Sequence, residues 1–192
     1  MTTHLLGAVY ALIAAVLYGG ADFSGAVAAR RLHHYQVLIL TAVTGAVVML
    51  IFTIFRGEGM PSLTSIFNAS LAGFLGSIGL ATLYYALANG RACIVAPTSA
   101  VVAAIMPVIY TAFFEGLPGA ITLAGFVLAL IGIWLTTRVE LSTEEHCNDG
   151  LLYGVISGLA FGGFFIFVAR IEPGYIFSPL IFSKLAAAIL GL

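Results

Sequence analysis

Charged side chains are scarce in this chain. Of its 192 residues, 7 are lysine or arginine, 8 are aspartate or glutamate, and 61% are hydrophobic. A mean hydropathy of +1.14 lies far above that of soluble globular domains, so the expected solvent is a lipid bilayer. The net charge is -1 and the basic residues are scattered, which leaves no continuous positive surface for a nucleic acid. We therefore predict a membrane protein with no nucleic-acid partner.

Residues for metal, redox and phosphate chemistry are also few. The 2 cysteines, Cys93 and Cys147, show no CxxC spacing, and the 4 histidines belong to no cluster with metal-ligand spacing. We expect neither a metal site nor a cofactor. The sequence has no GxxxxGK[ST] phosphate-binding loop, which excludes a built-in ATPase, and no pairing of a nucleophile with a base stands out. These absences predict a protein that is not an enzyme.

Long apolar runs are what the chain has instead. Each covers about 20 residues, the length that a helix needs to cross the hydrocarbon core of a bilayer. The runs are unbroken, whereas strands of a membrane barrel alternate apolar and polar residues. We predict an all-α integral membrane bundle with seven segments: Leu5–Ala29, Tyr35–Phe55, Ile66–Ala88, Ala92–Phe114, Leu117–Thr137, Gly150–Ala169, and Tyr175 to the end.

The sixth segment repeats the first. Gly7-Ala8-Val9-Tyr10 recurs as Gly150-Leu151-Leu152-Tyr153, and Tyr18-Gly19-Gly20 recurs as Phe161-Gly162-Gly163, at one offset of 143 residues. This repeat indicates a five-helix unit, residues 1–149, followed by the incomplete start of a second unit, residues 150–192. Because five is odd, the second unit must be inverted in the bilayer. The remaining helices of an expected ten could come from a missing C-terminal segment or from another chain, as in a homodimer.

Rows of small residues predict where helices pack. Glycines spaced by four share one face of the sixth segment, and small side chains let helix backbones approach closely in lipid. The glycines are Gly154, Gly158 and Gly162, and the first segment has Ala11, Ala15 and Gly19 at the matching positions. In the fourth segment Pro97 lies in the first turns, whereas Pro107 is interior and should bend the helix. Thr98 and Ser99 follow Pro97 and could either satisfy freed backbone groups or face a polar pathway.

Two ionisable residues lie within apolar segments. Asp22 lies about two thirds of the way along the first segment and is the best functional candidate, unless that helix is shorter and Asp22 lies at the interface. Lys184 in the seventh segment could snorkel to an interface or line a pathway. Measured from the face where both helices start, Asp22 is about 25 Å deep and Lys184 about 13 Å deep, so we expect no direct contact.

Other polar residues lie at segment ends. Glu115 is expected to be an interfacial carboxylate that caps the next helix. Tyr84 could belong to an aromatic belt or contact a substrate.

The chain resembles the EamA branch of the drug/metabolite transporter superfamily. The residues that carry the resemblance are Tyr18-Gly19, the run from Ala86-Leu87 to Ala96-Pro97, Pro107, and Glu115 ahead of Gly125 and Gly132. The resemblance implies two inverted five-helix units in a bacterial inner membrane that carry small metabolites, such as amino acids, by alternating access. It also implies a cytoplasmic N-terminus, whereas the arginines of the connections favour the reverse.

These observations together predict a secondary transporter of a small metabolite. Its pathway would lie between the two units, with Asp22, Tyr18, Tyr84, Thr98, Ser99 and Lys184 along it, and with proton coupling through Asp22. The alternative is a membrane protein that transports nothing, either a seven-helix sensor or a subunit that needs a partner chain. The repeat argues against a sensor, which has no need to begin a second copy of its own helices.

Overall fold

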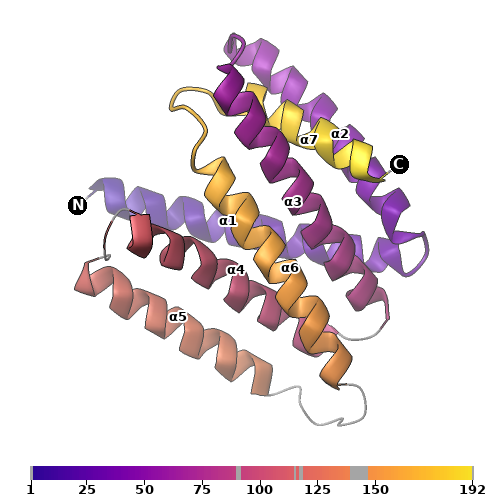
Figure 1. Ribbon diagram of the computed structural model, residues 1–192, viewed down its shortest axis with the longest axis vertical. Coiled ribbons are helices and arrows are strands. Elements are labelled where there is room, and N and C mark those ends of the chain that lie inside the picture. Colours follow the sequence, from indigo (N-terminus) through magenta and orange to yellow (C-terminus); the bar gives the residue numbers. More distant parts are fainter. Residues whose placement is uncertain (1, 90–91, 115, 117–118, 139–146, 192) are drawn as a thin grey trace.

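The computed structural model describes residues 2–89, 92–114, 116, 119–138 and 147–191, and over these residues the chain is helical without any strand (Figure 1). The helices are α1 (Thr2–Ala29), α2 (His34–Arg56), α3 (Leu63–Ala88), α4 (Ala92–Phe114), α5 (Ala120–Arg138), α6 (Cys147–Val168) and α7 (Phe177–Gly191). The predicted all-α bundle of seven helices is confirmed.

Several helix ends differ from the predicted segments. α3 begins earlier, at Leu63, because the Ser62 side chain accepts a hydrogen bond from the Ser65 N–H and caps the helix. α7 begins later, at Phe177, because Gly174, with a φ of +103°, turns the chain just before it. α6 begins at Cys147 rather than at the predicted Gly150, and α5 is described from Ala120 onwards. Glu115, predicted to be an interfacial cap, lies outside the described residues.

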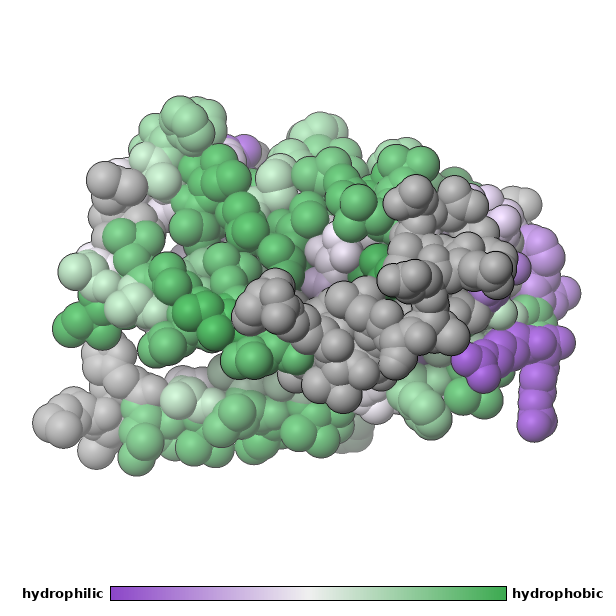
Figure 2. Space-filling view, turned by 90° about the horizontal axis from the view of Figure 1, so that it is seen from below, coloured by the Kyte–Doolittle hydropathy of each residue, from purple (hydrophilic) through white to green (hydrophobic). Residues whose placement is uncertain are grey.

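Five stretches of the described chain are long and apolar enough to cross a bilayer. They are Leu5–Ala29, Tyr35–Arg56, Leu63–Ala88, Ile94–Phe114 and Gly150–Val168, and the apolar parts of α5 and α7 are shorter. Figure 2 shows one face of the molecule, where apolar side chains predominate and hydrophilic ones gather at one edge. These stretches make the protein an integral membrane protein.

α6 and α7 lie between helices that precede them in the chain. α6 packs against both α3 and α4, α7 packs against α2 and α3, and α5 contacts α4 on the outside (Figure 1). Glycine makes the closest approaches possible: a Cβ built at Gly73 of α3 would overlap the backbone of Ser183 in α7, 2.6 Å from its carbonyl carbon. Such backbone contact lets helices associate in lipid, where apolar burial gives little driving force.

α1 and α6 run in opposite directions beside α3. Asn68 of α3 contacts Arg170 just after α6, Gly76 lies against Phe164 and Gly79 against Phe161, so these two helices are antiparallel. α1 instead brings its own C-terminal part to the same region of α3, where Gly25 lies against Tyr84. The helices begin in register with the repeat, since His34 opens α2 and Phe177 opens α7, 143 positions later.

α1 contacts only α2 and α3 among the described helices, and most of its side chains are exposed. Gly19 therefore has open space beside it, and no described helix packs against the small-residue face that was predicted to be a packing seam on α1. On α6 the matching glycines are all buried. The difference arises because α6 has both α3 and α4 as neighbours.

The connections between helices lie at two opposite ends of the bundle. The N-terminal end is where α1 begins and where the α2–α3 and α6–α7 connections lie, towards the upper left of Figure 1. The opposite end carries the α1–α2 connection and the C-terminus of α3.

Candidate functional site

A cavity of about 660 Å³ lies in the middle of the bundle. Its wall comes mainly from α1, α3, α4, α6 and α7, with Phe126 of α5. Small residues of α3 and α4 leave the space open, and aromatic rings of α6 narrow it. The charged and aromatic side chains of the wall are Tyr18, Asp22, Phe126, Phe161, Phe164, Phe165 and Lys184.

Asp22 reaches this cavity from within α1. The helix continues past Asp22 to Ala29, so the side chain lies inside the helix rather than at its end. Three residues later, on the same face, Gly25 lies against the ring of Tyr84, whose Cε1 would be 2.7 Å from a Cβ built at Gly25. Tyr84 is only 4% exposed and lies next to the cavity near Asp22 rather than in its wall. The Asp22 side chain is therefore half-buried, beside a cavity wall that is mostly apolar.

Lys184 enters the same cavity from α7. Its aliphatic stem crosses α2 at Gly45, where a built Cβ would lie 3.0 Å from Cε and 3.2 Å from Cδ. Gly45 thus provides the space through which the side chain extends. Asp22 and Lys184 form no ion pair with each other. Among the described residues, the ion pair is between Arg56 and Glu58. The cavity wall accordingly includes one acidic and one basic side chain that form no ion pair with each other.

A buried chain of hydroxyls joins three helices beside the cavity. Ser99 Oγ of α4 donates to Ser157 Oγ of α6 at 3.0 Å, and Ser157 Oγ donates to Gly79 O of α3 at 3.0 Å. Ser99 is also part of the cavity wall, so its hydroxyl both ties helices together and lies at the predicted pathway. Sequence reasoning missed Ser157, because it stands where the first copy has Ala14 and so has no repeated polar partner.

We expect the two serines to be energetically coupled. Ser99→Ala and Ser157→Ala should each lower stability by about 1 kcal/mol, because interhelical hydrogen bonds in membranes contribute about that much. The double variant should be less destabilised than the sum of the two, since they share one bond. Thermal unfolding in detergent of the four proteins measures this. Additive losses would show that the hydroxyl chain does not join α4 to α6.

The other predicted site residues divide between the cavity and a helix interface. Tyr18 and Pro107 line the cavity, with Pro107 inside α4. Thr98 does not: its Cβ would lie 2.7 Å from a Cβ built at Gly154 of α6. Pro97 is likewise inside α4 and absent from the cavity wall.

The three glycines of α6 form the interface with α4. Gly154, Gly158 and Gly162 lie in turn against Thr98, Val102 and Met106, so α4 and α6 run parallel and in register. Carbonyl oxygens of α4 approach the same glycines, with Ser99 O 2.8 Å from a Cβ built at Gly158. Any side chain at these positions would push the two helices apart and reshape the cavity beside them.

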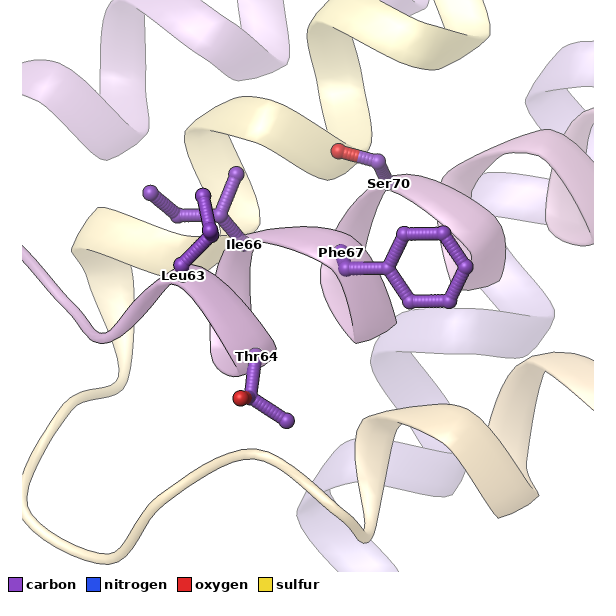
Figure 3. A pocket seen from close by; sticks show the side chains of 5 residues that line it. All are labelled: Leu63, Thr64, Ile66, Phe67 and Ser70. Atoms are coloured by element: carbon purple, nitrogen blue, oxygen red, sulfur yellow. The ribbon is translucent and has the colours of Figure 1, made fainter.

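A second hollow, of about 560 Å³, lies beside the first turns of α3 (Figure 3). Its five lining residues all belong to this one helix: Leu63, Thr64, Ile66, Phe67 and Ser70. Leu63 and Phe67 are exposed, and no charged side chain contributes. This hollow has the character of a lipid-facing surface, and the central cavity remains the candidate site.

Comparison with models of protein families identifies the family of this chain. Residues 5–138, which end with α5, match the model of the EamA-like transporter family. The chain belongs to this family. It is a family of transporters, and the protein is accordingly an integral membrane transporter. No curated protein and no solved structure matched the chain. The matched part supplies Tyr18, Asp22 and Ser99 to the cavity, whereas Lys184 lies beyond it.

Proposed function

We propose that this EamA-like protein is a secondary transporter of a small metabolite with amino-acid-like charges, located in a bacterial inner membrane. The observation that carries the proposal is the central cavity, whose wall includes the acidic residue Asp22 and the basic residue Lys184. About 660 Å³ is a usual volume for a small-molecule site. Because the sequence has no nucleotide-binding motif, the driving force would be an ion or solute gradient.

The charges of the cavity favour a substrate that carries both signs. A carboxylate or an amine inside a membrane protein is costly to leave unpaired, and interactions between charges are strong where water is scarce. A zwitterion could place its ammonium near Asp22 and its carboxylate near Lys184. The rings of Tyr18, Phe161 and Phe164 would then contact an apolar side chain of the substrate. Asp22 could also carry a coupled proton when no substrate is bound.

Alternating access would need α4 and α6 to move relative to the other helices of the bundle. Pro107 has no N–H and so cannot donate to the carbonyl one turn earlier, which allows α4 to bend beside the cavity. Gly162 on α6 faces this region of α4, at Met106. Movement at this place would widen or narrow the cavity directly.

We further propose that α1 is covered in the working transporter. The glycine face of α6 is closed by α4, whereas the matching face of α1, with Ala11, Ala15 and Gly19, is exposed. The inverted orientation of the two units predicts that helices equivalent to α3 and α4 pack there. These helices would complete the wall of the cavity behind Asp22.

Uptake into proteoliposomes tests the function. We expect the full-length protein to take up a small zwitterionic metabolite from an amino-acid panel without ATP, with stimulation by a pH gradient and collapse by a protonophore. Ala187→Trp should reduce this uptake at least about tenfold, because the indole would fill the cavity that Ala187 lines. Leu185→Trp, on the exposed face of the same helix, is the matched control. Equal uptake by the two variants would remove the cavity from the pathway.

A further inference from the structure

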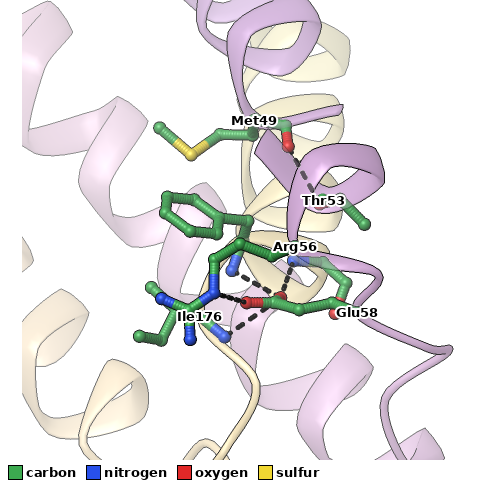
Figure 4. A network of polar contacts seen from close by, with 7 residues as sticks. Met49, Thr53, Arg56, Glu58 and Ile176 are labelled. Carbon is green, nitrogen blue, oxygen red and sulfur yellow. Dashed lines mark hydrogen bonds and ion pairs between the residues drawn. The ribbon is translucent and has the colours of Figure 1, made fainter. Parts of the chain in front are cut away.

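A cluster of polar contacts closes the N-terminal end of the bundle (Figure 4). Glu58 follows α2 in the chain, and its Oε2 accepts hydrogen bonds from the N–H groups of Ile176, Phe177 and Ser178 at 3.2, 2.9 and 3.0 Å. These are the amides that open α7, and the first amides of a helix have no partner within the helix. A carboxylate of the first unit therefore caps a helix of the second.

α7 has no cap of its own. The residue before the helix is Ile176, whose apolar side chain cannot accept a hydrogen bond. α2, which occupies the same place in the first unit, is capped locally instead: the Gln36 side chain accepts from the His33 N–H at 3.2 Å, and the Gln36 N–H donates to His33 O. The two units differ at this point, and only in the second is the cap a contact between units.

Glu58 is held in place from several sides. Arg56 Nε lies 4.0 Å from its other oxygen, and the Glu58 side chain is only 6% exposed. The guanidinium of Arg56 also lies over the ring of Phe177, which stacks on Phe52 of α2 with ring centres 5.2 Å apart. Burial alone would raise the pKa of Glu58, but the three backbone N–H donors outweigh it and hold the pKa below its ordinary value. The carboxylate consequently stays charged at neutral pH.

Other contacts tie the α6–α7 connection to the first unit at the same end. Asn68 Nδ2 of α3 donates to Arg170 O at 3.4 Å, and the Glu172 N–H donates to Ser65 Oγ at 3.2 Å. The Arg170 guanidinium donates to the hydroxyl of Tyr110, near the end of α4. Together these bonds join α3, α4 and the α6–α7 connection.

The cavity lies away from this cluster. Its residues on α3 run from Gly73 to Leu87, that is, from the middle of the helix towards the opposite end. On α1 they are Tyr18 and Asp22, also in the second half of the helix. The polar cluster therefore lies beyond the cavity, on the side of the N-terminal end.

We propose that Glu58 is a latch between the two units, which holds the N-terminal end of the cavity closed and must be released before the cavity can open there. That Glu58 holds this end closed does not depend on what the protein transports. That Glu58 must release α7 during a transport cycle rests on the proposed function. Glu58 acts as a positioning residue: it holds α7, which carries Lys184, against the α2–α3 connection. Loss of the latch should shift the population towards a state open at this end.

The test is the accessibility of a cysteine in the cavity. In the full-length protein, with Cys93 and Cys147 replaced by serine, Ala104→Cys places a thiol in the cavity wall. A membrane-impermeant maleimide is applied to proteoliposomes from each side in turn. Glu58→Ala should raise the labelling rate from the N-terminal end about fivefold. Glu172→Ala, which removes an exposed carboxylate at the same end, should leave the rate at the parental value.

A third variant separates the latch from simple capping. Adding Ile176→Asn to Glu58→Ala gives α7 a local cap without a tie to the first unit. We expect thermal stability to recover while labelling stays high. Two results would overturn the latch. One is labelling of the double variant at the parental rate. The other is labelling of Glu58→Ala that does not rise although this variant elutes and melts like the parent. No substrate is needed, so raised labelling without any uptake by the parent would refute the proposed transport alone.

Discussion

Gly73→Ala is expected to separate α3 from α7. The new methyl group would overlap the backbone of Ser183, with the carbonyl carbon at 2.6 Å and Cα at 2.7 Å. A backbone cannot move away by rotating a side chain, so the two helices must shift. Overpacking of this kind typically costs about 1 to 3 kcal/mol. Because Lys184 is the next residue along α7, its side chain in the cavity wall should also be displaced.

Thermal unfolding in detergent measures the effect. Gly125→Ala on α5, where a built Cβ meets nothing within 4 Å, is the control. That change should be neutral or stabilising by up to about 1 kcal/mol, because alanine favours a helix more than glycine does. If Gly73→Ala unfolded at the same temperature as the parent, the close crossing of α3 and α7 would be wrong.

Asp22→Asn should abolish coupled uptake. Asparagine has nearly the shape of aspartate but can neither carry a negative charge nor release a proton. Whether Asp22 binds the substrate ammonium or carries the coupled proton, uptake driven by a pH gradient should fall at least about tenfold, since ionisable residues inside membrane proteins mark substrate and proton pathways.

Exchange of labelled for unlabelled substrate across the membrane distinguishes these roles. Exchange needs no net proton movement, so it survives if Asp22 only carries the proton and is lost if Asp22 binds the substrate. Glu172→Gln, in the exposed α6–α7 connection, should change neither activity. Parental uptake with parental proton dependence in Asp22→Asn would exclude Asp22 from the mechanism.

The two halves of the cavity are chemically unequal, although the chain repeats. Phe165 stands where the first copy has Asp22, and both line the cavity. Lys184 stands where the first copy has Thr41, whose hydroxyl donates to carbonyl oxygens of its own helix. The part of the chain that matches the family model thus supplies an acidic residue to the cavity, and the part beyond it supplies a basic one. This polarity would orient a zwitterionic substrate along one direction in the cavity.

The helices could be predicted from the sequence because their signals are local. Runs of apolar residues of membrane-spanning length determine that the chain is an α-helical membrane protein. α4 was placed to the residue, from Ala92 to Phe114, despite its two prolines. The errors were at caps and turns, as for α7 beside Gly174, where a single residue sets the helix start.

The helix packing that places the residues of the candidate site around one cavity could not be predicted from such local signals. Asp22 and Lys184 were expected at depths of about 25 and 13 Å from one face, from the rise along straight helices. The structure places both in the wall of one cavity, because a cavity between several packed helices extends along their length. Nothing in the sequence around Gly45 indicates a role for it, yet its lack of a side chain leaves the space that the Lys184 stem occupies.

The sequence by itself determined the lipid environment, the helices and the repeat, since hydropathy and spacing are properties of neighbouring residues. Only the tertiary structure decided which helices meet. The cap of α7 comes from Glu58, 118 to 120 residues away, and the hydroxyl chain from Ser99 to Gly79 crosses three helices. Such contacts depend on how helices cross, and no local pattern records the crossing.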